Sequence, residues 1–253
     1  MTYPILEFDS TPEAFIEPSK IIRARDLPEH CVICFFREVI DKVIAEHKAK
    51  IMVENRWEDG PHHIYEISYQ QNQRLAFFHP GVGAPIAAGL LEEAIAFGCR
   101  KFIACGGCGV LEKDMAVGHI VVVSGAIRDE GVSYHYLPPG REVVANASVV
   151  SVLVNLLDGR GIPHRVGRTW TTDAPYRETA NKIARRREEG CLTVEMESAA
   201  LMAVAQFRNV TFGQALYGGD DLSGIEWDNR QWQSRKDIRE SLFWLCADAC
   251  LLL

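Results

Sequence analysis

The chain has 253 residues, of which 47% are hydrophobic and 24% are charged, and its formal net charge is −7. This length and composition predict one globular domain, residues 1–253, with a large core. The acidic balance argues against nucleic acid or an anionic membrane surface as a partner. The sequence shows neither a signal peptide nor a run of about 18 apolar residues, so we expect a cytoplasmic protein without a membrane helix.

The eight cysteines include two C-x-x-C pairs, Cys31/Cys34 and Cys105/Cys108. In a cytosolic protein these cysteines need not form disulfides. The first pair lies in an apolar strand-like run, where its two thiols point in different directions, and the second pair flanks two glycines. Buried cysteine often serves as a small apolar residue, so we predict no metal site.

Strands and helices are expected to alternate along the chain. In order, the pattern predicts strand 31–36, helix 37–47, strands 64–69 and 74–79, helix 86–97, strands 101–105 and 119–124, helix 147–157, strands 165–171, 192–197 and 214–217, and helix 235–253. Gly98 is the expected stop of the second helix. This alternation favours an α/β fold with a largely parallel or mixed sheet.

Two glycine-rich segments follow expected strands and are predicted to be turns. They are Gly81-Val82-Gly83 and Gly106-Gly107-Cys108-Gly109. Glycine allows backbone N–H groups to converge on an anion and allows a ligand to approach the chain closely. Either segment alone fits an ordinary tight turn, but together they suggest one pocket at the edge of the sheet.

The segment from Thr193 to Leu201 carries two carboxylates two residues apart, Glu195 and Glu197. On a strand this spacing points both side chains to the same face, at the end where open α/β sheets bind ligands. Carboxylates accept hydrogen bonds from vicinal sugar hydroxyls, Met196 offers an apolar contact, and Ser198 is the expected N-cap of a helix. An isolated E-x-E would more simply be a solvated strand end.

Val194-Glu-Met-Glu-Ser-Ala199 resembles the ribose-binding signature of the nucleoside phosphorylase-I family. That family includes purine nucleoside phosphorylases, uridine phosphorylases and nucleosidases, and the resemblance extends from about Cys31 to about Gly224. It implies the phosphorylase/hydrolase-like fold, a three-layer α/β/α domain with a mixed central sheet and a distorted barrel. It also implies phosphate as co-substrate, no other cofactor, and a homodimer or homohexamer.

The resemblance further assigns roles to individual residues. It places Gly107, Cys108 and Gly109 beside the nucleoside, and it implies phosphate contacts from Gly83, Arg37 and Arg56, the last reaching into a neighbouring subunit. Ala104 stands where many phosphorylases carry an arginine. A phosphate dianion needs about two arginines or equivalent backbone donors, so the sequence leaves phosphorolysis and hydrolysis both open.

The segment Gly218–Gly224 is expected to assist the departure of the base. A purine leaves readily when its N7 is protonated, and a carboxylic acid can deliver that proton. Asp221 matches the aspartate of purine-cleaving family members, with Asp220 beside it. A helix N-cap is the alternative role of Asp221.

The base itself is expected to stack on Trp170 or Tyr176, although Trp170 would also suit the core. The Gln-x-Arg pair with which uridine phosphorylases recognise uracil is absent after Tyr176. The sequence therefore predicts a nucleoside phosphorylase with a purine preference. A nucleosidase that uses water, or a non-catalytic nucleoside-binding protein, remains an alternative.

Overall fold

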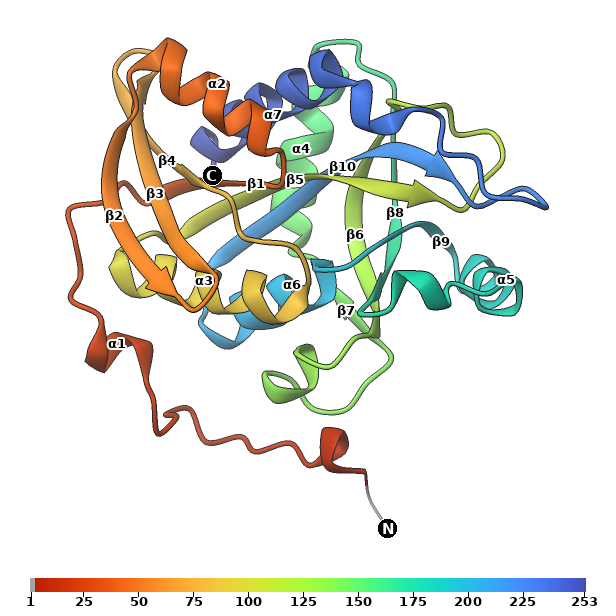
Figure 1. Ribbon diagram of the computed structural model, residues 1–253, viewed down its shortest axis with the longest axis horizontal. Helices are drawn as coiled ribbons and strands as arrows, with labels where there is room; N and C mark the ends of the chain where they lie inside the picture. Colours follow the sequence, from red (N-terminus) through yellow and green to blue (C-terminus); the bar gives the residue numbers. More distant parts are fainter. Residues whose placement is uncertain (1–2) are drawn as a thin grey trace.

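The computed structural model describes residues 3–253, so Met1 and Thr2 of the expected domain 1–253 lie outside the described residues. One large sheet separates two layers of helices (Figure 1). On one side pack α2 (Arg37–His47), α4 (Ala147–Gly159) and α7 (Lys236–Leu251), and on the other pack α3 (Ala84–Phe97) and α6 (Ser198–Phe207). Two short helices, α1 (Pro18–Ile21) and α5 (Ala180–Glu188), lie at the periphery (Figure 1). The predicted three-layer α/β/α fold is confirmed.

The central sheet is mixed and partly closed on itself. Its strands are β1 (His30–Cys34), β2 (Lys50–Trp57), β3 (Gly60–Tyr69), β4 (Gln73–Phe78), β5 (Lys101–Val110), β6 (Ile120–Asp129), β7 (Glu142–Val144), β8 (His164–Thr172), β9 (Cys191–Glu195) and β10 (Thr211–Asp221). They follow the order β10-β6-β8-β9-β5-β1-β4-β3-β2, and β10 also pairs with β5 in parallel. The strands β5, β9, β8, β6 and β10 therefore close a distorted barrel. Strands β1, β4, β3 and β2 extend from it as a wing, and β7 pairs with β6.

The core consists of a buried layer on each side of the sheet. Ala87, Leu91 and Leu201 belong to the layer beneath α3 and α6, whereas Ile40, Leu153 and Phe243 belong to the layer beneath α2, α4 and α7. All eight cysteines are buried and unpaired. Within residues 3–253, no three His, Cys, Asp or Glu side chains gather in a way that could hold a metal ion.

Several expected element boundaries differ from the structure. The segment Gly106–Gly109, predicted as a turn, continues strand β5, because its backbone pairs with β10 over Leu216–Gly218. Strand β10 likewise continues through Gly218 and Gly219 to Asp221, with an irregularity in register. Strand β2 was not predicted because its pattern is polar and mostly exposed. The helix predicted over 37–47 is confirmed as α2, and Gly98 ends α3 with a positive φ.

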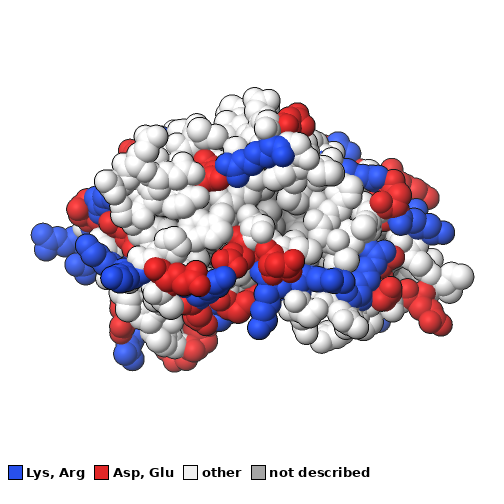
Figure 2. Space-filling model, turned by 90° about the horizontal axis from the view of Figure 1, so that it is seen from above, with Lys and Arg blue, Asp and Glu red and all other residues white. Residues whose placement is uncertain are grey.

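The surface carries charges of both signs. On the face seen from above in Figure 2, Lys and Arg side chains alternate with Asp and Glu around an uncharged, hollowed centre. Among the helices of the described chain, none has the length and apolar character to cross a membrane.

Candidate active site

The main cavity has a volume of about 530 Å³ and lies beside β5, β9 and β10. This volume is within the range of about 300–1,000 Å³ typical of small-molecule sites. Its lining brings together residues from distant parts of the chain. The ionisable ones are Cys108, Glu178, Glu195, Glu197, Asp220 and Arg239.

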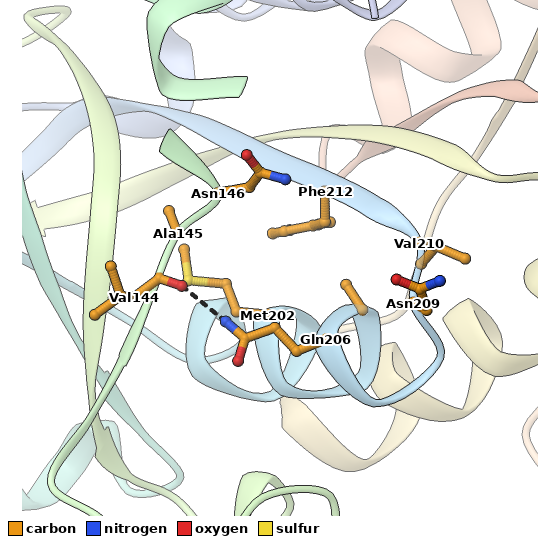
Figure 3. Close-up of a pocket in the computed structure, with 9 residues that line it drawn as sticks. Val144, Ala145, Asn146, Met202, Gln206, Asn209, Val210 and Phe212 are labelled. Atoms are coloured by element: carbon orange, nitrogen blue, oxygen red, sulfur yellow. Dashed lines mark hydrogen bonds between the residues drawn. The ribbon is translucent and has the colours of Figure 1, made fainter. Parts of the chain in front are cut away.

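A second hollow, drawn in Figure 3, has a different character. It measures about 360 Å³ and is lined by β7, the C-terminal half of α6 and the start of β10. The Gln206 amide donates a hydrogen bond to the Val144 carbonyl across it (2.8 Å), and none of its lining residues is ionisable. The main cavity, in contrast, has six ionisable residues in its lining.

Glu195 ends strand β9 and organises the start of α6. Its carboxylate accepts hydrogen bonds from the Thr171 hydroxyl (2.6 Å) and from the backbone N–H groups of Glu197 (2.7 Å) and Ser198 (2.6 Å). These N–H groups have no partner within a helix, and a negative charge is favourable at this end. The prediction of Ser198 as N-cap is wrong, since Ser198 is the first helical residue and its hydroxyl donates to Gln214 (2.6 Å).

Glu197 occupies the N-cap position of α6 and is only 6% exposed. Its Oε1 accepts the backbone N–H of Gly83 (2.6 Å), whereas its Oε2 accepts no hydrogen bond from the described residues. Burial and the neighbouring charge of Glu195 raise the pKa of Glu197 to about 8, despite the hydrogen bond from Gly83. Glu197 thus offers a free carboxylate oxygen to a ligand, and Met196 lines the cavity beside it.

The two glycine-rich segments contribute differently. Gly107, Cys108 and Gly109 line the cavity, and the Cys108 thiol donates to the Tyr217 carbonyl (3.2 Å). Of the earlier segment, only Val82 lines the cavity. Gly83 has φ +101° and directs its N–H to Glu197, so this donor is not free for an anion in the structure.

Asp220 and Asp221 face different surroundings. Asp221, the predicted acid, lies outside the lining of the cavity, accepts the Ser223 N–H (2.8 Å) and forms an ion pair with Arg230. Burial would raise the pKa of Asp221, but the Ser223 hydrogen bonds and the Arg230 charge outweigh it and lower the pKa. Asp220 lines the cavity and accepts a hydrogen bond from the Trp227 indole (2.7 Å). The geometry therefore favours Asp220 over Asp221 as the acid.

Neither aromatic residue predicted to stack on a base reaches the cavity. Trp170 is 0% exposed, and its indole donates to Asp129 (3.0 Å), so it is a core residue. Tyr176 is 100% exposed and does not line the cavity. The aromatic lining comes instead from Phe35, Phe36 and Trp232.

The predicted phosphate-binding arginines lie outside the cavity of their own chain. Arg37 begins α2 near His79, whose pKa burial and the Arg37 charge lower to about 4. The Arg56 side chain lies on β2, is 77% exposed and pairs with Glu54 (3.3 Å). One arginine that the sequence analysis did not identify, Arg239, lines the cavity.

Arg239 is held from several directions. It forms an ion pair with Glu38 (2.6 Å), donates to the Tyr217 hydroxyl (3.0 Å) and lies over the rings of Phe36 and Trp232. These partners belong to α2, β10 and the turn before α7. No local sequence pattern marks such a residue, because its environment is created only when these distant elements pack together.

Comparison with known proteins identifies the family. The model of the phosphorylase superfamily matches residues 29–240. The chain belongs to this superfamily. It is 30% identical over 198 residues to a guanosine phosphorylase of Halorubrum lacusprofundi, covering 78% of this chain and 80% of the relative. It is 29% identical to a uridine phosphorylase of Haemophilus influenzae, but over only 44% of each chain.

The chain is also similar in fold to solved structures. AMP nucleosidase from Bacteroides thetaiotaomicron VPI-5482 superposes with a TM-score of 0.71 at 20% identity, covering 90% of this chain and 89% of the other. At this identity the likeness shows the shared fold alone. The predicted family and fold are confirmed, and the protein is a nucleoside-processing enzyme.

Proposed function

We propose that the protein cleaves the N-glycosidic bond of a purine nucleoside with phosphate, releasing the free base and ribose 1-phosphate. The observation that carries the proposal is that Glu197, with one free carboxylate oxygen, and Asp220 line the same cavity of about 530 Å³. The first supplies a hydrogen-bond acceptor for a sugar, and the second supplies an acid for a leaving group.

The residues of the cavity suggest how the reaction proceeds. The ribose hydroxyls donate to Glu197 while Met196 contacts the sugar, and positive charge develops on the ribose as the bond to the base breaks. Asp220 gives its proton to N7, so the base leaves without negative charge. Phosphate then attacks C1′, which forms ribose 1-phosphate.

The preference for a purine is supported by two features. The Halorubrum relative is named a guanosine phosphorylase and covers most of this chain. In addition, an acid at the end of β10 suits N7 of a purine, an atom that uracil lacks. The uridine phosphorylase among the relatives makes uridine the comparison that any assay must include.

Hydrolysis is the second candidate because the anion ligands are few. Arg239 is the one arginine in the lining, and Glu38 already neutralises it. Ala104 is buried where the family often places another arginine, and the Gly83 N–H is bound to Glu197. Water as the acceptor would require none of these groups.

The acceptor and the base can be tested together. Guanosine, inosine, adenosine and uridine are incubated with the protein with and without phosphate, and the sugar product is identified. We expect purine nucleosides to give ribose 1-phosphate only when phosphate is present. Free ribose formed at an equal rate without phosphate would identify a nucleosidase, and tight binding without turnover would identify a binding protein.

A further inference from the structure

The chemistry of the main cavity leaves a nearby histidine, His79, without a role. His79 directly follows β4, is half-buried and lies outside the lining of the cavity. Its Nδ1 atom accepts the backbone N–H of Gly81 (3.0 Å), in the glycine-rich turn Gly81-Val82-Gly83 before α3. A ring nitrogen that accepts a hydrogen bond carries no proton, so the neutral imidazole has its proton on Nε2.

The surroundings of His79 keep its ring neutral. Burial and the charge of Arg37 lower the pKa of His79 to about 4, and the neighbouring His62 acts in the same direction. The backbone of Phe35 and the charge of Glu38 oppose this shift only in part. The Phe35 ring also meets the imidazole edge-on, with 6.5 Å between the ring centroids. The His79 ring therefore stays a hydrogen-bond acceptor throughout the neutral pH range.

Two hydrogen bonds hold the glycine turn at its two ends. Gly81 donates to His79, and Gly83 donates to Oε1 of Glu197 (2.6 Å). Between them Val82 is 67% exposed, and glycine has no side chain that could pack against the core. Among residues 3–253, no other hydrogen bond of this turn reaches beyond the turn and α3. The position of the turn therefore depends on these two contacts.

We propose that His79 is a positioning residue of the active site: it fixes the glycine turn, so that the Gly83 N–H reaches the Glu197 carboxylate that binds the ribose. A hydrogen bond donated to a carboxylate favours its charged form. Here it opposes burial and the charges of Glu195 and Asp173, which together raise the pKa of Glu197. The inference rests on the proposed function for the ribose at Glu197, and it adds a residue that acts on this group through the turn.

Three variants test the contact between His79 and the turn. His79→Phe keeps a ring of similar size but removes the acceptor, whereas His79→Asn keeps an acceptor oxygen near the place of Nδ1. The matched control is His47→Phe, because His47 ends α2, is exposed and lies outside the cavity. The ligand is formycin B, a C-nucleoside analogue of inosine whose carbon–carbon bond to the ribose is not cleaved.

Calorimetric titration measures the affinity for this ligand from about pH 6 to about pH 9.5. Wild-type affinity should increase with pH around a midpoint near 8, as Glu197 becomes ionised. In His79→Phe we expect the midpoint to rise by about one pH unit, the scale of one weakened hydrogen bond to a charged group, and the affinity at neutral pH to fall by about tenfold. His79→Asn and His47→Phe should keep the wild-type midpoint. The ligand and the other titrating groups of the cavity are the same in every variant, so the difference reports the change at His79.

Nitrogen NMR of wild-type protein with labelled histidine tests the same contact without a substitution. The His79 signals, identified by their loss in His79→Asn, should show a neutral ring with its proton on Nε2 over the same pH range. A proton on Nδ1, or equal midpoints in wild type and His79→Phe, would overturn the role of His79 and leave nucleoside cleavage intact. A wild type that cleaves no nucleoside, while His79→Phe still shifts the midpoint of binding, would overturn the proposed function and support the positioning role.

Discussion

Glu195 and Glu197 show how two identical side chains, two residues apart, acquire different tasks. Glu195 directs its oxygens to the Thr171 hydroxyl and to two N–H groups at the start of α6, so it stabilises the local backbone. Glu197 receives only the Gly83 N–H and keeps Oε2 for a ligand. The E-x-E spacing predicted both side chains at the cavity, but the division of tasks depends on Gly83 and Thr171, which come from other elements.

Because Glu197 is buried, we expect it to lower the stability of the folded protein while it contributes to nucleoside binding. Its pKa of about 8 exceeds the ordinary value of 4.5, so its contribution to folding is full below about pH 4.5 and is lost as the pH rises through 8. The Glu197→Gln variant has no carboxyl group to titrate at this position. The difference in free energy of unfolding between this variant and the wild type should therefore shift in favour of the variant as the pH rises from 4.5 to 8. We expect a gain on the order of 2–4 kcal/mol, together with about 10- to 100-fold weaker nucleoside binding.

Urea unfolding at several pH values and titration with substrate measure the two effects. Gln can still accept the Gly83 N–H, so the loop should keep its position. A stability difference that does not change with pH would show that Glu197 is ionised in the folded protein, contrary to its environment. Unchanged nucleoside binding would remove Glu197 from the sugar site.

We expect substitutions of the two neighbouring aspartates, Asp220 and Asp221, to have different effects. Asp220→Asn should slow cleavage of purine nucleosides by about 10²–10⁴, because asparagine cannot deliver a proton. Substrates with an activated leaving group, such as nitrophenyl ribosides or 7-methylated purine nucleosides, should lose much less. Asp221→Asn should mainly lower stability, because it weakens the ion pair with Arg230.

Rates on both substrate types and thermal unfolding of both variants decide between the two aspartates. If Asp221→Asn causes the selective loss on purine nucleosides and Asp220→Asn does not, the sequence assignment of Asp221 is right and the role given to Asp220 is wrong.

At the scale of elements, hydrophobic periodicity predicted helices and strands whose formation depends on the local sequence. The apolar spacing of residues 37–47 predicted α2 with its observed bounds. The glycine-rich segment Gly106–Gly109 of β5, in contrast, was interpreted as a turn, although glycine in a strand also marks close approach of another element. Arg239 and Glu178 reach the cavity only through tertiary packing, so neither could be recognised from its sequence neighbours.

Gly213 in β10 illustrates such a close approach. A Cβ at this position would overlap Cγ1 of Val149 on α4 and lie 3.2 Å from Cδ1 of Ile103 on β5. Val149 is β-branched and cannot easily rotate away. Gly213→Ala should therefore lower the free energy of unfolding by about 1–3 kcal/mol.

The matched control is Gly159→Ala at the end of α4. A Cβ there would meet nothing within 4 Å, and alanine is favoured over glycine in helices by about 0.5–1 kcal/mol. In denaturant unfolding, the midpoint of Gly213→Ala should thus shift to a lower denaturant concentration, and that of Gly159→Ala to a higher one. Equal stability of the two variants would mean that α4 can shift away from β10 without cost.

At the scale of the whole molecule, closure of the barrel assembles the site. The additional pairing of β10 with β5 brings Asp220 next to Cys108, and the antiparallel pairing of β5 with β9 brings Glu195 to the same cavity. These contacts join segments more than 80 residues apart in the chain. The family resemblance anticipated this fold from a short motif, whereas strand alternation alone indicated only an α/β class.

The position of Arg56 predicts that the active molecule is at least a dimer. Arg56 lies on the wing of the sheet, away from the cavity of its own chain, so it can serve a phosphate site only in a neighbouring subunit. Arg56→Ala and Glu197→Gln should each be weakly active alone. In a mixed dimer, the cavity of the first variant receives Arg56 from the second, so one of two sites regains every wild-type group.

Co-expression of the two variants with different tags tests this arrangement. Random pairing should restore about a quarter of the wild-type activity per chain, because half of the dimers are mixed and each of these has one complete site. Light scattering on the same sample gives the oligomeric state. A fully active monomer, or a mixture no more active than its separate components, would mean that Arg56 does not act between subunits.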